Sequence, residues 1–283
     1  MKKLYAVLIA AATLAAAWMT AACGRQTPIA EGRSSGTGVS VVSLAPALTE
    51  LVFQLGCGDA LAGRTDVCNK PSAALSAPVV GQFGLPVPET VLRLKPDLIL
   101  ANALVNPRLR SLFEQAGCRV ILKPCDTLED YQDWVRLLGE ELKVPDAASA
   151  EINRIRDWLT RNGQRKASGK KVLFLLWDEP VMVAGAGTLP DTAIRLAGGV
   201  NILGDEKGYV KCSPEFLQRT KDQVDYIIWA AEKPFSKAAP QIRALSYPEP
   251  DSSLDVDSFL RPGPRFTDGV DALRVSLEGK TQK

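Results

Sequence analysis

The chain has 283 residues, of which 46% are hydrophobic and 23% charged, and it contains no histidine. This composition can bury the core of one large domain or of two ordinary lobes, and it excludes a largely disordered protein. The missing histidine excludes Ser-His-Asp and Cys-His nucleophiles and histidine-ligated zinc or haem sites. We therefore expect a protein that is not an enzyme, with a carboxylate-dependent surface enzyme as a minor alternative.

Residues 1–22 have the pattern of a secretion signal. Two lysines precede an apolar run that is too short and too alanine-rich to favour a membrane span. Small residues then precede Cys23, which suits a bacterial lipoprotein whose cysteine is lipidated. Thr20 stands where the usual lipobox has leucine, and ordinary cleavage after Ala22 fits as well. We expect an exported protein, in the periplasm or at the cell surface, held at the membrane by a lipid on Cys23.

The mature chain is nearly neutral, because the signal removes two of the 34 basic residues and leaves 32 against 32 acidic ones. This balance argues against a nucleic-acid-binding protein. Five cysteines follow Cys23, and none forms a CxxC pair, so a zinc site has no support. Cys68 and Cys125 both follow predicted strands of the first half, which leaves a disulfide between them open.

The chain order predicts two similar halves. Gly/Ser/Thr-rich residues 23–38 predict a flexible tether. Over residues 39–127, and again over 169–278, continuous apolar strands alternate with amphipathic helices, which indicates parallel sheets covered on both faces. Residues 128–168 show helical spacing interrupted by Pro145 and predict a linking strut. The predicted fold is α/β, with two Rossmann-like lobes joined by one long backbone helix and a ligand cleft between the lobes.

Several segments in this order carry a family resemblance. They are VVSLAPALTELVFQLGCGDALAGRTD (41–66), LPVPETVLRLKPDLIL (85–100), LAGGVNIL (196–203), CSPEFLQ (212–218) and RPGPRFTDGVDAL (261–273). Together they resemble the substrate-binding proteins of ABC importers for cobalamin and ferric siderophores, over nearly the whole mature chain. The loop at residues 64–71, of RTDxC(N/D)xP type, is nearer the cobalamin branch. The resemblance implies a monomer that holds its ligand between two lobes and delivers it to an importer's membrane subunits.

Ligands of open α/β sheets bind at the carboxyl ends of the strands. The residues predicted to contact the ligand there are Arg64, Asp66, Phe83, Trp177, Met182, Tyr209, Trp229, Phe259 and Arg261. The same ends carry Asn102 and Cys125. The aromatic residues favour a corrinoid, whose broad apolar face is ringed by amides.

Five cations near the predicted rim favour a different ligand. They are Arg64, Lys70, Lys123, Lys211 and Arg261. Anionic chelates usually recruit basic residues, so a ferric siderophore or another iron chelate stays the alternative. In either case we expect a transported ligand, with no resident cofactor or metal.

Glu89 and Glu215 each open a short helix that precedes a predicted strand, one in each half. An acidic residue in a first helical turn is favoured by the helix dipole. The resemblance implies a second role, in which such a pair meets arginines of the importer's membrane subunits.

Overall fold

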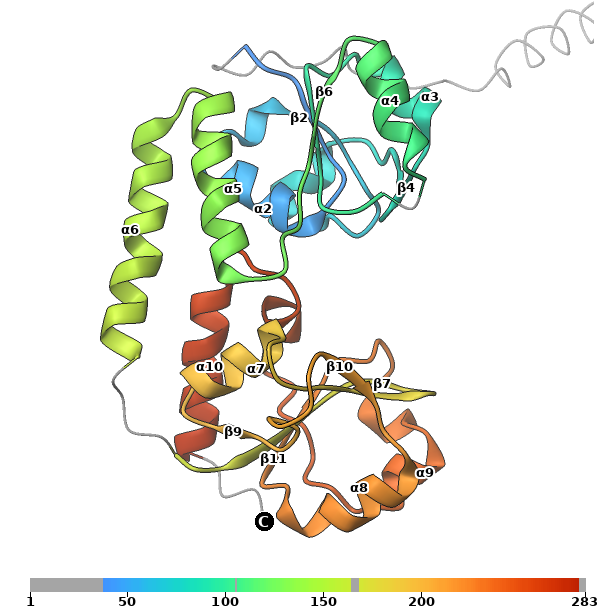
Figure 1. Cartoon of the computed structure of the whole chain (residues 1–283), viewed down its shortest axis with the longest axis vertical. Helices are drawn as coiled ribbons and strands as arrows, with labels where there is room; N and C mark the ends of the chain where they lie inside the picture. The colour runs from blue at the N-terminus through green and yellow to red at the C-terminus, as the bar shows by residue number, and fades with distance from the viewer. Residues whose placement is uncertain (1–37, 105, 164–167, 280–283) are drawn as a thin grey trace, which may run out of the picture. The chain divides into compact units, whose positions relative to one another are not determined.

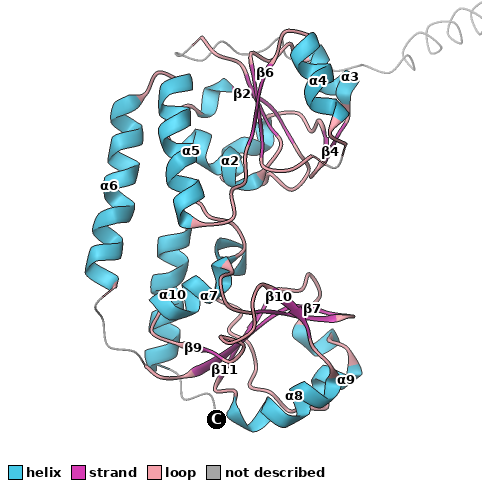
Figure 2. Cartoon of the chain, in the orientation of Figure 1, coloured by secondary structure: helices cyan, strands magenta, loops and turns pink. Residues whose placement is uncertain are grey.

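The computed structural model describes residues 38–104, 106–163 and 168–279. The predicted signal, Cys23 and the tether up to residue 37 lie outside the described residues. The described chain forms two α/β lobes, each built on its own sheet (Figures 1 and 2). None of the described helices is long and apolar enough to span a membrane.

The N-terminal lobe contains a sheet of four parallel strands in the order β2-β1-β5-β6. The strands are β1 (Val41–Ser43), β2 (Leu61–Arg64), β5 (Leu98–Ala101) and β6 (Arg119–Leu122). Helices α2 (Pro46–Gln54), α3 (Pro88–Arg93), α4 (Arg108–Gln115) and α5 (Leu128–Glu141) cover it. The predicted alternation of strands and helices is confirmed in this lobe.

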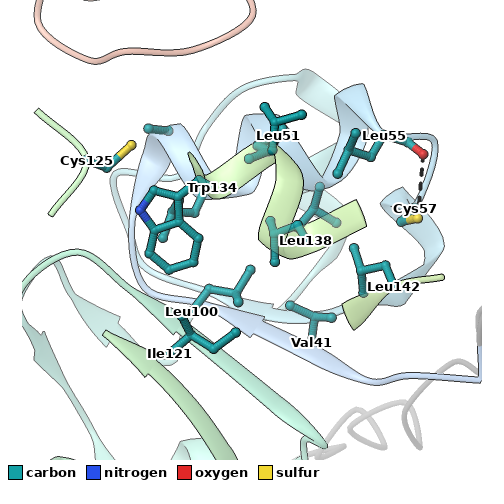
Figure 3. Packing of buried hydrophobic residues seen from close by; sticks show 14 of the residues in the cluster. Val41, Leu51, Leu55, Cys57, Leu100, Ile121, Cys125, Trp134, Leu138 and Leu142 are labelled. Carbon is teal, nitrogen blue, oxygen red and sulfur yellow. Dashed lines mark hydrogen bonds between the residues drawn. The ribbon is translucent and has the colours of Figure 1, made fainter. Parts of the chain in front are cut away.

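Both faces of this sheet are buried, as its continuous apolar strands predict. On one face, Trp134 and Leu138 of α5 lie beside Leu51 of α2 and above Leu100 and Ile121 of the strands (Figure 3). The opposite face packs against α3 and α4 through a second buried cluster. The carboxyl ends of the strands are thereby held at one edge of a rigid layer.

Residues 128–168 form two helices that are separated just before Pro145, where the sequence interrupts the helical spacing. Helix α5 ends at Glu141, and α6 runs from Pro145 to Asn162. Proline cannot continue α5, because its ring removes a backbone donor and clashes with the preceding turn, but it suits the first turn of α6. Helix α5 belongs to the N-terminal lobe. Helix α6 connects the lobes: Ile155 packs in the N-terminal core and Trp158 in the C-terminal core.

The C-terminal lobe has a mixed sheet in the order β10-β8-β7-β11, with β9 also paired to β7. Its strands are β7 (Lys171–Asp178), β8 (Val181–Ala184), β9 (Val200–Asn201), β10 (Tyr209–Lys211) and β11 (Tyr226–Trp229). Strands β8 and β10 are antiparallel to their neighbours, and neither was predicted. Helices α7 (Leu189–Leu196) and α10 (Phe266–Gly279) cover one face, and α8 (Pro214–Thr220) and α9 (Pro240–Arg243) the other.

Buried ion pairs join the two lobes, and we call Glu50, Arg261 and Arg265 the inter-lobe clamp. Glu50 of α2 is 5% exposed. Its two carboxylate oxygens accept hydrogen bonds from Nε and Nη2 of Arg265, both at 2.8 Å. Nη1 of Arg261 lies 3.8 Å from the same carboxylate. These hydrogen bonds raise the pKa of Arg265 above its ordinary value.

A second pair fixes the same turn of α10 from the connecting helix. Glu151 of α6 accepts two hydrogen bonds from Arg154, both at 2.8 Å. Arg154 also donates to the Thr267 hydroxyl at 2.7 Å and to the Pro264 carbonyl at 3.1 Å. Bidentate arginine–carboxylate pairs hold a defined orientation. The segment that leads into α10 is therefore fixed by both the N-terminal lobe and α6.

Candidate functional site

A cavity of about 340 Å³ is lined by residues of both lobes. We call it the strand-end cavity, since most of its N-terminal residues follow the carboxyl ends of parallel strands, where open α/β sheets bind ligands. Its lining consists of Pro46, Ala47, Val67, Phe83, Asn102, Cys125, Asp126, Leu260 and Arg261.

The structure brings two of the predicted ligand-binding residues, Phe83 and Arg261, into this cavity. Phe83 lies at the tip of the hairpin formed by β3 (Gly81–Gln82) and β4 (Leu85–Pro86), and 43% of it is exposed. Arg261 follows a short 3-10 turn, and its Nη2 donates to Asp257 at 2.7 Å. An exposed ring and an anchored guanidinium can contact one bound molecule. Their ligand contacts stay a prediction.

Arg64 and Asp66 do not line the cavity, so the placement of Arg64 as a ligand-facing cation is wrong. Arg64 is buried, and its Nη1 donates to the carbonyl oxygens of Thr65 at 3.0 Å and Asp66 at 3.4 Å. The Asp66 carboxylate accepts from the backbone N–H of Val67 at 2.9 Å. Both residues shape the loop that presents Val67 to the cavity.

Three predicted residues of the C-terminal lobe lie together on its sheet. Trp177 of β7 pairs with Met182 of β8, and Tyr209 belongs to the next strand, β10. Trp177 is 48% exposed and Tyr209 45%. Burial, followed by the negative charge of Asp126, raises the pKa of Tyr209. None of the three lines the cavity, and their ligand contacts stay a prediction.

Two other predicted aromatics serve the core of the C-terminal lobe. Phe259 is 0% exposed and packs edge-to-face on Phe174, with ring centroids 6.4 Å apart. Its placement as a ligand contact is wrong, because the 3-10 turn of residues 256–259 points this ring inward. Trp229 packs edge-to-face on Phe235, and its indole N–H donates to the Lys233 carbonyl at 2.7 Å.

Sequence reasoning missed Asp126 and placed Asn102 and Cys125 only as strand-end residues. Asp126 and Asn102 follow β6 and β5, which are neighbours in the sheet. Asp126 also precedes Thr127, the residue that caps α5 with a capping box. The signal for Asp126 was its place between a strand and a capped helix. This position can be read from the sequence, but many acidic residues in loops have a similar one.

The five cysteines among the described residues are all buried free thiols. The Cys68–Cys125 disulfide is therefore not formed. Cys68 instead lies 3.1 Å from the Thr65 hydroxyl. Burial, followed by the charges of Asp130 and Asp126, raises the pKa of Cys125 to about 12. No group of three His, Cys, Asp or Glu side chains in the described ranges can hold a metal ion.

Glu89 and Glu215 are exposed acids in the first turns of α3 and α8. Each helix leads to a strand of its lobe's sheet, α3 to β5 and α8 to β11. Hydrogen bonds from its own backbone N–H and from Ser213 lower the pKa of Glu215. Both side chains are thus available at the surface.

Known proteins share this architecture. Residues 41–242 match the model of the family described as periplasmic binding protein. The chain belongs to the periplasmic binding protein family. Its members capture small ligands outside the cytoplasm and deliver them to ABC importers, so the expectation of a binding protein and not an enzyme is confirmed.

Individual relatives include proteins for two ligand types. The vitamin B12-binding protein of Vibrio cholerae is 29% identical over 248 residues, which cover 84% of this chain and 88% of that protein. The solved structure of the Vibrio cholerae vitamin B12-binding protein BtuF is 26% identical, with a TM-score of 0.65 over 84% of this chain and 96% of that chain. The heme-binding protein BhuT, solved with two hemes, is 27% identical, with a TM-score of 0.68 over 84% of this chain and 97% of that chain.

Proposed function

We propose that the protein binds a corrinoid outside the cytoplasm and passes it to the membrane subunits of an ABC importer. The observation that carries this proposal is the chemistry of the strand-end cavity. Its lining is mostly apolar and presents the half-exposed ring of Phe83. The one cation that the described residues contribute to this lining, Arg261, is already paired with Asp257. Such a surface suits a broad, neutral molecule with polar groups at its edge.

The other cations near the predicted rim lie elsewhere. Arg64 is buried against backbone carbonyl oxygens. Lys70 lines a separate cavity beside Glu50 and Arg265. Lys123 lies 3.9 Å from Asp133, and Lys211 is exposed on β10. An anionic chelate would need basic groups facing it, so this arrangement favours a corrinoid over a ferric siderophore.

Haem is a second candidate, because a haem-binding protein is among the similar structures. Haem iron in binding proteins takes an axial side chain such as histidine, tyrosinate, thiolate or methionine. This chain has no histidine. Tyr209 and Met182, which have side chains of the required kind, are not among the residues that line the strand-end cavity, and Cys125, which does line it, is a buried thiol. Haem is therefore less well supported than a corrinoid.

Isothermal titration of the mature protein tests the proposal. We expect saturable heat with cobalamin and with cobinamide, and none with a ferric siderophore. We also expect no shifted Soret band on addition of haem. Phe83→Ala should weaken cobalamin binding about tenfold, since stacked aromatic area is lost, while the melting temperature stays within about 2 °C. Leu85→Ala, an exposed residue of the same hairpin outside the cavity lining, is the matched control. Binding of the siderophore or haem alone would reject the corrinoid.

The affinity for cobalamin should be nearly independent of pH between about 6 and 8. The chain has no histidine, and the pKa of Cys125 is raised to about 12. The pKa of Tyr209 is also raised above its ordinary value. Since these groups stay protonated throughout the window, the dissociation constant should change by less than about twofold. Titrations at pH 6, 7 and 8 in one buffer ionic strength measure this. A tenfold change would require a group in the cavity that gains or loses a proton within this pH window.

The anchoring proposal concerns residues outside the described part of the chain. We propose that Cys23 is lipidated and that the protein acts as a monomer, without a resident cofactor, at the periplasmic or outer face of a membrane. Cys23→Ser should move the protein from the membrane fraction to the soluble extract. Mass spectrometry of the N-terminal peptide would show the lipid or, alternatively, plain cleavage after Ala22.

A further inference from the structure

The strand-end cavity carries an imbalance of charge. In the part of the chain that the structure describes, two charged side chains line it, Asp126 and Arg261. Arg261 is held by Asp257 at 2.7 Å and lies 3.8 Å from Glu50. Within the described ranges, no cation comes within ion-pair distance of the Asp126 carboxylate; only its backbone N–H is bonded, to Asp130. The charge of Arg261 is thus balanced by Asp257, although its Nη1 has no hydrogen-bond partner among the described residues, and the charge of Asp126 is not balanced.

The position of Asp126 lets its charge act on both lobes. It immediately precedes the capped first turn of α5, where the helix dipole stabilises an anion. Its charge contributes to the raised pKa values of Cys125 beside it and of Tyr209 on the opposite lobe. A ligand in the cavity would lie within reach of the same field.

A second acceptor lies at the neighbouring strand end. Asn102 follows β5, lines the cavity, and its Oδ1 is covered from solvent without a hydrogen-bond partner in the described part of the chain. A buried acceptor without a hydrogen bond costs free energy, and this cost is removed when a ligand donates a hydrogen bond to it. Two adjacent strand ends therefore offer acceptor oxygens to whatever occupies the cavity.

We infer that Asp126 is a specificity-determining residue, which accepts a hydrogen bond from an uncharged N–H group at the edge of the ligand and repels ligands with a carboxylate there. The inference rests on the proposed function: in a corrinoid the N–H belongs to a peripheral primary carboxamide. Asn102 offers a second acceptor to the same edge. Discrimination then comes from repulsion of the wrong ligand as much as from attraction of the right one.

Matched ligands test this inference. Cobalamin is compared with its monocarboxylates, in each of which one peripheral amide is hydrolysed to an acid. At pH 7 and low salt, at least one monocarboxylate should bind the wild-type protein about tenfold or more weakly than cobalamin. Asp126→Asn removes the charge at nearly constant shape. In this variant, the dissociation constant of the same monocarboxylate should lie within about twofold of that of cobalamin. Raising the salt concentration should bring the two dissociation constants closer together in the wild-type protein, because salt screens the repulsion, and should leave their ratio in the variant unchanged.

Asp222→Asn, an exposed acid outside the cavity lining, is the control and should keep the wild-type ratio. Melting temperatures show that each variant is folded. Equal affinity of the wild-type protein for cobalamin and all its monocarboxylates would overturn the inference while leaving the proposed function intact. An unchanged ratio in Asp126→Asn would also overturn it. No binding of cobalamin at all would instead reject the proposed function.

Discussion

Uptake of the ligand should fall to background when Glu89 and Glu215 are both replaced by glutamine. Both carboxylates are exposed, one on each lobe, and neither lines the strand-end cavity. If they meet arginines of the importer, removing one partner of a close interfacial charge pair costs roughly 2–5 kcal/mol of binding free energy. Loss at two sites would leave almost no docked complex. The measurement is uptake of labelled cobalamin in cells that express the variant and the cognate importer.

Ligand affinity and melting temperature should stay at wild-type values in the same double variant, because the ligand site is untouched. Asp146→Asn is the matched control, since Asp146 is also an exposed acid in a first helical turn, that of α6. The control variant should take up ligand normally. Wild-type uptake by the double variant would show that the two glutamates serve only their helices.

Glu50→Gln should lower the free energy of unfolding by about 2–4 kcal/mol. Removing one member of a buried ion pair leaves its partner charged and poorly solvated, and fully buried cases lose roughly 3–5 kcal/mol. The expected loss is smaller here because the Arg265 side chain is 25% exposed. Asp255 still accepts a hydrogen bond from Arg265 in the variant. Urea denaturation measures the change in the free energy of unfolding. The dependence of this free energy on urea concentration should be the same for the wild-type protein and the variant.

The same substitution should weaken ligand binding, because Glu50 also lies beside Arg261, which lines the strand-end cavity. Glu114→Gln supplies the control: Glu114 pairs with Arg110 at 2.9 Å, but both side chains are exposed. Exposed pairs contribute at most about 1 kcal/mol. If both variants lost the same small amount, the inter-lobe clamp would be no stronger than an ordinary surface pair.

The N-terminal lobe could be predicted from the sequence because its strands are continuous apolar runs between amphipathic helices. In the C-terminal lobe, the same pattern missed β8 and β10. Strand β8 follows β7 after the two-residue turn Glu179–Pro180, and the sequence pattern places its four residues in the loop at the end of β7. Strand β10 has three residues, and none of them is fully buried, so no hydrophobic pattern marks it. The break at Pro145 was visible, but only packing shows that α5 belongs to one lobe.

The candidate site was harder to predict than the fold. Strand ends indicated the edge of the sheet at which the strand-end cavity lies, and Phe83 and Arg261 came from that rule. Residues after an element can point either way, however, as Phe259 shows by pointing into the core. Arg64 and Asp126 show the limit for charges. Arg64 turns onto the carbonyl oxygens of the next two residues, and Asp126 has no cation within ion-pair distance among the described residues. Residue type and strand-end position alone predict neither arrangement.

The buried thiols have a consequence for survival in an oxidising compartment such as the periplasm. Oxidants and disulfide exchange attack the thiolate, and a pKa of about 12 leaves Cys125 as thiolate in roughly one molecule in 10⁵ at pH 7. Cys57, Cys118 and Cys212 also have pKa values raised mainly by burial. An unfolded chain would lose this protection at once. The folded protein therefore carries these four thiols in the less reactive protonated form, and oxidative damage to them should be concentrated in molecules that have unfolded.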